Sequence, residues 1–110
     1  MADSEVLKTI AAQFSRDLKV SISKWFGLPC LKTNNKVFAM LWGRDVAFKL
    51  TGEANAEALR IPGAHLFDPK AKRNPMKEWV QIPADYSSEW NRFAKLAVEY
   101  VSTLTGDEDR

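Results

Sequence analysis

The middle of the chain alternates between apolar and polar positions in a way that predicts short strands. Residues 36–42 (KVFAMLW) are apolar at almost every position, which indicates a strand that is covered on both faces. Residues 46–50 alternate instead, so that Val46, Phe48 and Leu50 share one face and the two residues between them share the other. The pattern therefore predicts an antiparallel meander with a core strand in its middle.

Turn-forming residues flank the core strand on both sides. Asn34-Asn35 tolerates positive φ and predicts a tight hairpin turn before the strand. Gly43-Arg44-Asp45 predicts a second turn directly after it. We expect each turn to join neighbouring antiparallel strands.

An interrupted strand pattern precedes this meander. Residues 20–23 alternate and predict a strand, and residues 30–33 predict another short one. Between them, Gly27 permits an unusual backbone conformation and Pro29 withholds a donor from the sheet ladder. We expect a bend or a bulge at this point.

Apolar residues at helical spacing predict a helix at each end of the chain. The first helix is expected from Asp3 to about Arg16, and the last from about Ser87 to Leu104, where Gly106 ends it. The apolar stripe of the first helix consists of Val6, Leu7, Ile10, Ala11 and Phe14. The stripe of the last helix consists of Trp90, Phe93, Ala94, Ala97, Val101 and Leu104.

The segment that joins the meander to the last helix mixes several signals. Asn55 is placed to cap a short helix over residues 56–60. Residues 64–67 and 78–82 predict strands. Residues 70–75 (KAKRNP) predict a basic, proline-bounded loop between them.

These elements predict a fold of the α+β class. Two layers are expected, in which the N- and C-terminal helices pack on one face of a mainly antiparallel sheet. We expect one domain over residues 1–106 and a frayed acidic tail over residues 107–110.

The composition is that of a soluble protein in a reducing compartment. A single cysteine, Cys30, excludes an internal disulfide. No apolar run approaches the roughly 18 residues needed to span a bilayer. The N-terminus also lacks the basic and apolar regions of a signal peptide. We expect a cytoplasmic protein with no membrane contact.

Positive charge is concentrated ahead of the tail. The formal net charge of the chain is +2, and its last four residues sum to −2. Residues 1–106 therefore carry a net charge of +4. We predict that basic side chains from the strands and the loop contact a partner, either another protein or a nucleic acid. The predicted partner-binding residues are Lys24, Lys32, Lys36, Lys49, Lys72, Arg73 and Lys77.

An alternative hypothesis is a small-ligand-binding domain. Aromatic residues recur near the interrupted strand and near the last strand, and they can line an apolar pocket. The predicted pocket residues are Trp25, Pro29, Cys30, Phe67 and Trp79.

The sequence carries little that indicates catalysis. His65 is the sole histidine, and no second His or Cys stands at a spacing suited to a metal. Cys30 lies between Lys24 and Lys32 in sequence, which leaves two interpretations open, a reactive thiol and a buried small hydrophobe. The glycines are isolated, so no phosphate-binding loop is expected. We expect neither an enzyme nor a bound cofactor or metal.

Short motifs along the chain resemble the TfoX/Sxy N-terminal domain family and the wider YjbR/MmcQ-like group. The motifs are residues 24–32 (KWFGLPCLK), 36–39 (KVFA), 48–50 (FKL), 67–69 (FDP) and 75–80 (PMKEWV). The resemblance implies a small α+β domain, usually bacterial. It also implies a regulatory role of the kind that namesake members have in competence for DNA uptake. They are thought to act there with other regulators and not as enzymes.

Overall fold

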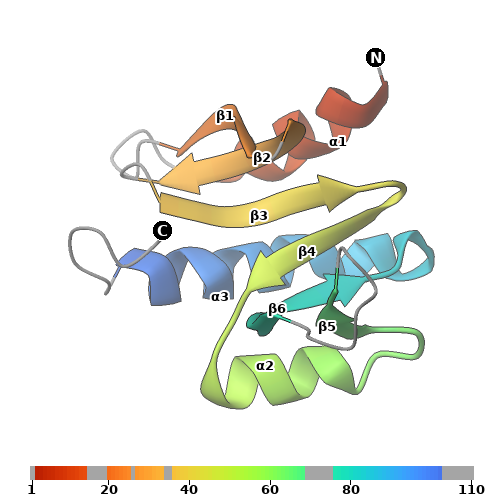
Figure 1. Ribbon diagram of the computed structural model, residues 1–110. Helices are drawn as coiled ribbons and strands as arrows, with labels where there is room; N and C mark the ends of the chain where they lie inside the picture. Colours follow the sequence, from red (N-terminus) through yellow and green to blue (C-terminus); the bar gives the residue numbers. More distant parts are fainter. Residues whose placement is uncertain (1, 15–19, 26, 34–35, 69–75, 103–110) are drawn as a thin grey trace.

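The computed structural model describes residues 2–14, 20–25, 27–33, 36–68 and 76–102, and in this part of the chain six strands form one sheet beside three α-helices (Figure 1). The strands are β1 (Val20–Trp25), β2 (Leu28–Thr33), β3 (Lys36–Trp42), β4 (Asp45–Lys49), β5 (His65–Phe67) and β6 (Met76–Ile82). The helices are α1 (Ala2–Ala11), α2 (Gly52–Leu59) and α3 (Trp90–Ser102), and a 3-10 helix, η2 (Ala84–Glu89), precedes α3.

The sheet confirms the predicted α+β class and element order. Its strands lie in the order β1-β2-β3-β4-β6-β5, and every neighbouring pair is antiparallel. The first four strands are a meander of sequence neighbours. After them, β6 pairs with β4, and β5 takes the outer edge.

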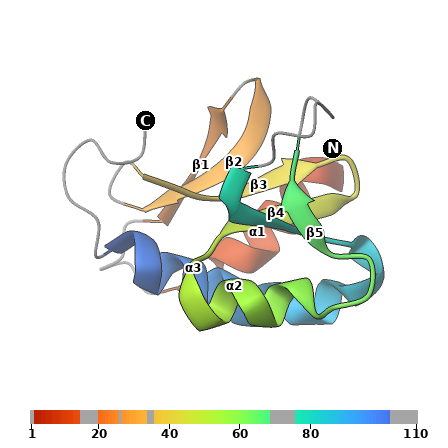
Figure 2. The ribbon, with the colours of Figure 1, turned by 60° about the horizontal axis from the view of Figure 1, so that its bottom comes forward.

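All three helices pack on one face of the sheet, as Figure 2 shows with the helices below the strands. The prediction placed the terminal helices there, and the structure adds α2, whose Ala58 is buried in the same core. Strands β2, β3, β4 and β6 contribute Leu31, Phe38, Ala39, Leu41, Val46, Phe48, Val80 and Ile82. Helices α1 and α3 contribute Leu7, Ile10, Trp90, Phe93, Ala94, Ala97, Val98 and Val101.

The face of the sheet opposite the helices, here called the second face, has a core of its own. It consists of Cys30, Val37, Met40, Ala47, Phe67 and Trp79, with Leu28 and Trp42 packed against them. No helix of the described segments belongs to this cluster. The alternation predicted for β4 is therefore confirmed, since Val46 and Phe48 belong to the helix-side core and Ala47 to the second face.

The predicted interruption at Gly27 and Pro29 is a turn between two paired strands. Gly27 has a φ of 77°, and the register pairs Trp25 with Leu28 and Lys24 with Pro29. Pro29 thus belongs to β2, which begins two residues earlier than predicted.

The bulge lies further along, where the β2–β3 register shifts between Leu31 and Lys32. Leu31 pairs with Ala39 but Lys32 pairs with Val37, so Phe38 is the extra residue. This extra residue lets Phe38 and Ala39, although adjacent, both enter the helix-side core.

The ends of the helices differ from the prediction. Helix α1 ends at Ala11 and not near Arg16, because the next amides, Gln13 and Phe14, bond to carbonyls three residues back and tighten the last turn. Phe14 then packs on Phe38 with the two rings nearly perpendicular and their centres 5.9 Å apart. Ser87 lies in η2 and α3 begins at Trp90, since the Trp90 N–H still bonds to the Ser87 carbonyl three residues back, as in a 3-10 helix.

Asn55 does not cap α2, so that prediction is wrong. The helix starts at Gly52, and the Asn55 amide donates to the Leu50 and Lys77 carbonyls at 3.0 and 3.1 Å. The side chain therefore ties α2 to the ends of β4 and β6. The predicted Asn34-Asn35 turn, the loop at 70–75, Leu104, Gly106 and the acidic tail lie outside the described residues.

Two leucines with opposite environments test the helix-side core. Leu31 is fully buried, whereas Leu59 on α2 is 38% exposed. We expect Leu31→Ala to lower the free energy of unfolding by about 2–5 kcal/mol. The same change at Leu59 should alter it by no more than about 0.5 kcal/mol. Urea unfolding followed by circular dichroism measures both, and equal losses would contradict the assignment of the core.

The β3–β4 turn depends on the backbone of Gly43. Its φ is 61°, and a Cβ placed there would meet nothing within 4 Å, so any cost is conformational. We expect Gly43→Ala to lower the free energy of unfolding by about 1–2 kcal/mol. Gly43→Asn should cost less, because Asn adopts positive φ more readily. Equal losses from the two variants in urea unfolding would contradict this origin.

Candidate functional site

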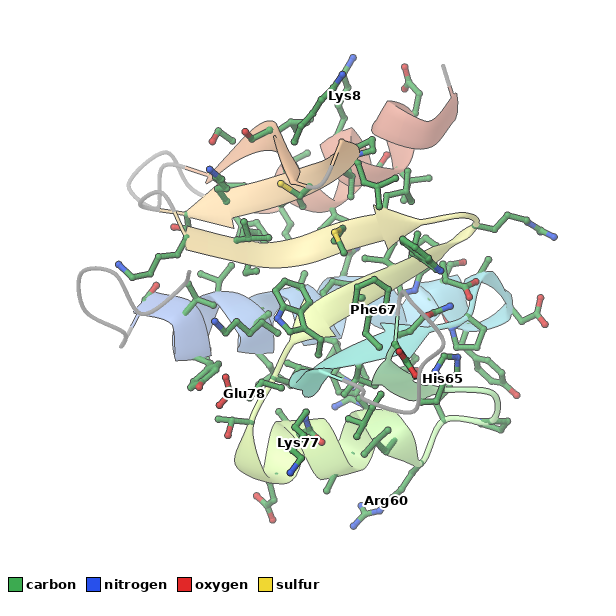
Figure 3. All side chains as sticks on the ribbon, viewed as in Figure 1. Lys8, Arg60, His65, Phe67, Lys77 and Glu78 are labelled. Carbon is green, nitrogen blue, oxygen red and sulfur yellow. The ribbon has the colours of Figure 1, made fainter. Side chains whose placement is uncertain are left out.

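The second face brings together three of the residues predicted to line a pocket. Cys30 and Phe67 are 0% exposed and Trp79 is 4% exposed, and all three belong to one cluster. Figure 3 shows Phe67 over the middle of the sheet, and the edge of its ring meets Trp42 with the ring centres 5.1 Å apart. These aromatic rings pack on one another and leave almost no surface for a ligand.

The remaining predicted pocket residues are placed differently. Pro29 is half-buried and, by strand alternation, faces away from its neighbour Cys30. The side chain of Trp25 lies outside the described part of the structure. The small-ligand hypothesis stays a prediction, and it requires the packed aromatic cluster to open.

Three of the predicted partner-binding lysines lie on the second face. Lys32 is paired with Val37 and Lys49 with Trp79, so each shares the face of its partner. Lys77 stands two residues before Trp79 in β6, so by strand alternation it shares that face, and its side chain is exposed (labelled in Figure 3). Lys49 differs from the other two because it is only 8% exposed.

The other basic residues of that set do not join them. Lys24 is paired with Pro29 and Lys36 with Thr33, and both lysines point to the helix side by strand alternation. Lys72 and Arg73 lie outside the described residues. On the second face, the structure therefore leaves two accessible cations of this set, the half-buried Lys32 on β2 and the exposed Lys77 on β6, which are separated by β3 and β4; Lys49 on β4 is buried.

Charge is divided between the two layers of the fold. The strands carry more basic than acidic residues, namely Lys24, Lys32, Lys36, Lys49 and Lys77 against Asp45 and Glu78. The helices carry the reverse, namely Asp3, Glu5, Glu53, Glu57, Asp85, Glu89 and Glu99 against Lys8, Arg92 and Lys95. The sequence alone did not indicate this division, because it emerges only when each residue is assigned to a layer.

A charged groove of about 420 Å³ lies between α2 and α3. It is lined by Glu53, Ala54, Glu57, Arg92, Lys95, Leu96 and Glu99. Arg92 donates to Glu57 at 2.9 Å and to Glu89 at 3.1 Å, which links α2 to the start of α3. The hydrogen bond to Glu57, followed by that to Glu89, raises the pKa of the Arg92 guanidinium above its ordinary value. The sequence did not indicate this link, since Glu57 is distant from Arg92 along the chain.

Asp45 anchors the end of the sheet and is not free for chemistry. One of its carboxylate oxygens accepts from the Gln81 amide at 2.7 Å, and the other accepts from the Ala84 backbone N–H at 3.0 Å. The carboxylate thereby joins the start of β4 to β6 and to the start of η2.

His65 and Cys30 lie on strands near opposite edges of the sheet, β5 and β2. His65 is exposed, and its Nδ1 lies 2.9 Å from the carbonyl oxygen of Leu66. Cys30 is enclosed in the second-face core. Within the described residues, no three His, Cys, Asp or Glu side chains gather as they would around a metal ion.

The fold defines a small α+β domain, and comparison with known proteins adds no family to it. No protein-family model, no curated protein and no solved structure gives a significant match to the chain. The resemblance to the TfoX N-terminal family therefore stays a prediction from the motifs. Among the described helices, none combines the length and the apolar character that crossing a membrane requires.

The burial of Cys30 predicts slow thiol chemistry. With 0% of the residue exposed, a reagent reaches the sulfur only when the sheet opens. We expect alkylation of the native protein near neutral pH to be much slower than alkylation in urea. Leu59→Cys in a Cys30→Ala background is the matched control, because residue 59 is exposed. Equally fast labelling of Cys30 and of the control in the native state would identify a reactive, accessible thiol.

Proposed function

We propose that this chain is a non-enzymatic binding domain that holds an acidic macromolecule against the second face of its sheet. The observation that supports this proposal most directly is that three lysines, Lys32, Lys49 and Lys77, lie on the second face with one acidic residue, Asp45, whereas the helices carry more acidic than basic residues. A surface whose charge has one sign attracts partners of the opposite charge and repels partners of the same charge. This orients a charged partner as it approaches. The regulatory role implied by the TfoX resemblance fits such a domain.

The chemistry of the second face favours contact through charge over contact through stacking. Bases of a single strand stack on exposed aromatic rings, but Phe67 and Trp79 are buried. The accessible groups are the ammonium ends of Lys32 and Lys77, which bind carboxylates or phosphates. We therefore propose a partner that presents a row of acidic groups, either a protein surface or a nucleic-acid backbone.

The sequence between β5 and β6 is itself basic. Residues 69–75 contain Lys70, Lys72 and Arg73 and connect Asp68 to Met76. In sequence, these three cations therefore stand between β5, which carries Phe67, and β6, which carries Lys77 and Trp79.

Charge reversal on the second face tests the proposal. Labelled duplex DNA and labelled poly-glutamate serve as probes of the two partner classes, and fluorescence anisotropy follows binding across a salt series. We expect binding to at least one probe that weakens as salt rises. Lys32→Glu combined with Lys77→Glu should weaken it by about tenfold or more, because two attractions become repulsions.

A matched double variant controls for net charge. Lys8→Glu combined with Lys95→Glu makes the same change in charge at two exposed positions of α1 and α3. We expect it to leave affinity within about twofold of the unaltered chain, since it acts on the opposite layer.

Binding to DNA alone identifies a nucleic-acid partner and binding to poly-glutamate alone a protein partner. Failure to bind either at low salt, or equal losses in both double variants, would overturn the proposal.

A further inference from the structure

Strand β1 forms one edge of the sheet and presents an exposed apolar residue there. In the part of the chain that the structure describes, β1 pairs only with β2, and Figure 1 shows it at the top edge. Ile22 lies in the middle of β1 and is 41% exposed, more than any other large hydrophobic residue of the described segments. Ser21 and Lys24 beside it are also exposed.

The backbone of β1 directs hydrogen-bonding groups away from the sheet at alternate residues. In a hydrogen-bonded antiparallel pair, the two residues exchange both N–H···O bonds, which Pro29 cannot do. The Lys24–Pro29 pair is therefore a non-hydrogen-bonded pair, in which the backbone N–H and C=O groups of each residue point away from the other strand. Because the β1–β2 register has no shift, Ile22 and Val20 follow the same alternation. The N–H and C=O groups of Val20, Ile22 and Lys24 thus face outward.

The two edges of the sheet differ in their protection against pairing. The opposite edge, β5, is three residues long and its register shifts between Leu66 and Phe67, both of which discourage addition of a strand. Strand β1 is six residues long and regular, and it carries no proline. Its single charge, Lys24, lies near one end.

We propose that two copies of this chain pair through β1 about a two-fold axis, with Ile22 opposite the partner's Ile22. In this register Val20 lies opposite the partner's Lys24, so all the outward-facing backbone groups of one copy meet those of the other. The two isoleucine side chains lie on the same face and cover each other's exposed surface. The two Lys24 ammonium groups lie at opposite ends of the β1–β1 interface, so no like charges face one another. A second copy is thus the occupant that this strand fits by its own symmetry.

The pairing joins two sheets into one continuous sheet. The two-fold axis runs through the sheet from face to face, so the second faces of both copies lie on the same side. Lys32 and Lys77 of each copy then belong to one extended surface. Self-association through β1 does not depend on the partner binding proposed above.

Mass measurement with a matched pair of variants tests the dimer. Sedimentation equilibrium over micromolar to millimolar concentrations should show a mass that rises toward twice the 12.4 kDa of one chain. Ile22→Lys places a charge in the middle of the β1–β1 interface and should raise the dissociation constant of the dimer by about tenfold or more. Leu59→Lys, at an apolar residue of similar exposure on α2, should leave it unchanged. A single-chain mass throughout, or a dimer that Ile22→Lys does not weaken, would overturn the proposal.

Amide hydrogen exchange distinguishes strand pairing from side-chain contact. At high concentration the outward-facing amides of Ile22 and Lys24 should exchange more slowly, because the second copy bonds to them. The amides of Ser21 and Ser23 already face β2 and should keep their rates. If the sample has the mass of a dimer but exchange at Ile22 and Lys24 does not depend on concentration, the dimer interface lies elsewhere. That result would overturn the proposal.

Discussion

The packing of α3 across the central strands is the contact on which the rest of the molecule depends. A helix of thirteen residues is marginal by itself, so α3 exists because its buried stripe meets β3 and β4. Each large side chain buried there contributes about 1.5–3 kcal/mol. The same contact fixes which face of the sheet is covered by helices. It thereby determines which lysines are left on the second face.

The attachments around this core are polar and lie at its corners. Asp45 joins β4 to β6 and η2, Asn55 ties α2 to two strands, and Arg92 links α2 to the start of α3. Asp45 and Asn55 bond to backbone groups at or next to the ends of strands and of η2, whereas Arg92 joins two exposed carboxylates to the first turn of α3. On the second face, the Asp45–Gln81 bond engages neither Lys32 nor Lys77, which leaves these two cations available to a partner.

The sequence predicted what depends on periodicity and missed what depends on tertiary position. The alternation around Phe48 and the helical spacing around Phe93 identified the core faces, because a covered face requires apolar residues at a fixed interval. Asn55 was misassigned, because a side chain that suits a helix cap suits a link between strands equally well, and only the fold decides. The face of Lys49 followed from alternation, whereas its burial did not, because the neighbouring Trp79 comes from a distant strand.

The position of β6 between β4 and β5 has a consequence for the order in which the sheet can form during synthesis. Strands β1 to β4 pair with their neighbours in sequence, so each pairing closes only a short loop as the chain leaves the ribosome. Strand β5 emerges next, but its neighbour in the sheet has not yet been made. Only when β6 arrives can it pair with β4 and give β5 an edge to join. Four of the six strands can thus assemble from local contacts, while the other two wait for one long-range closure.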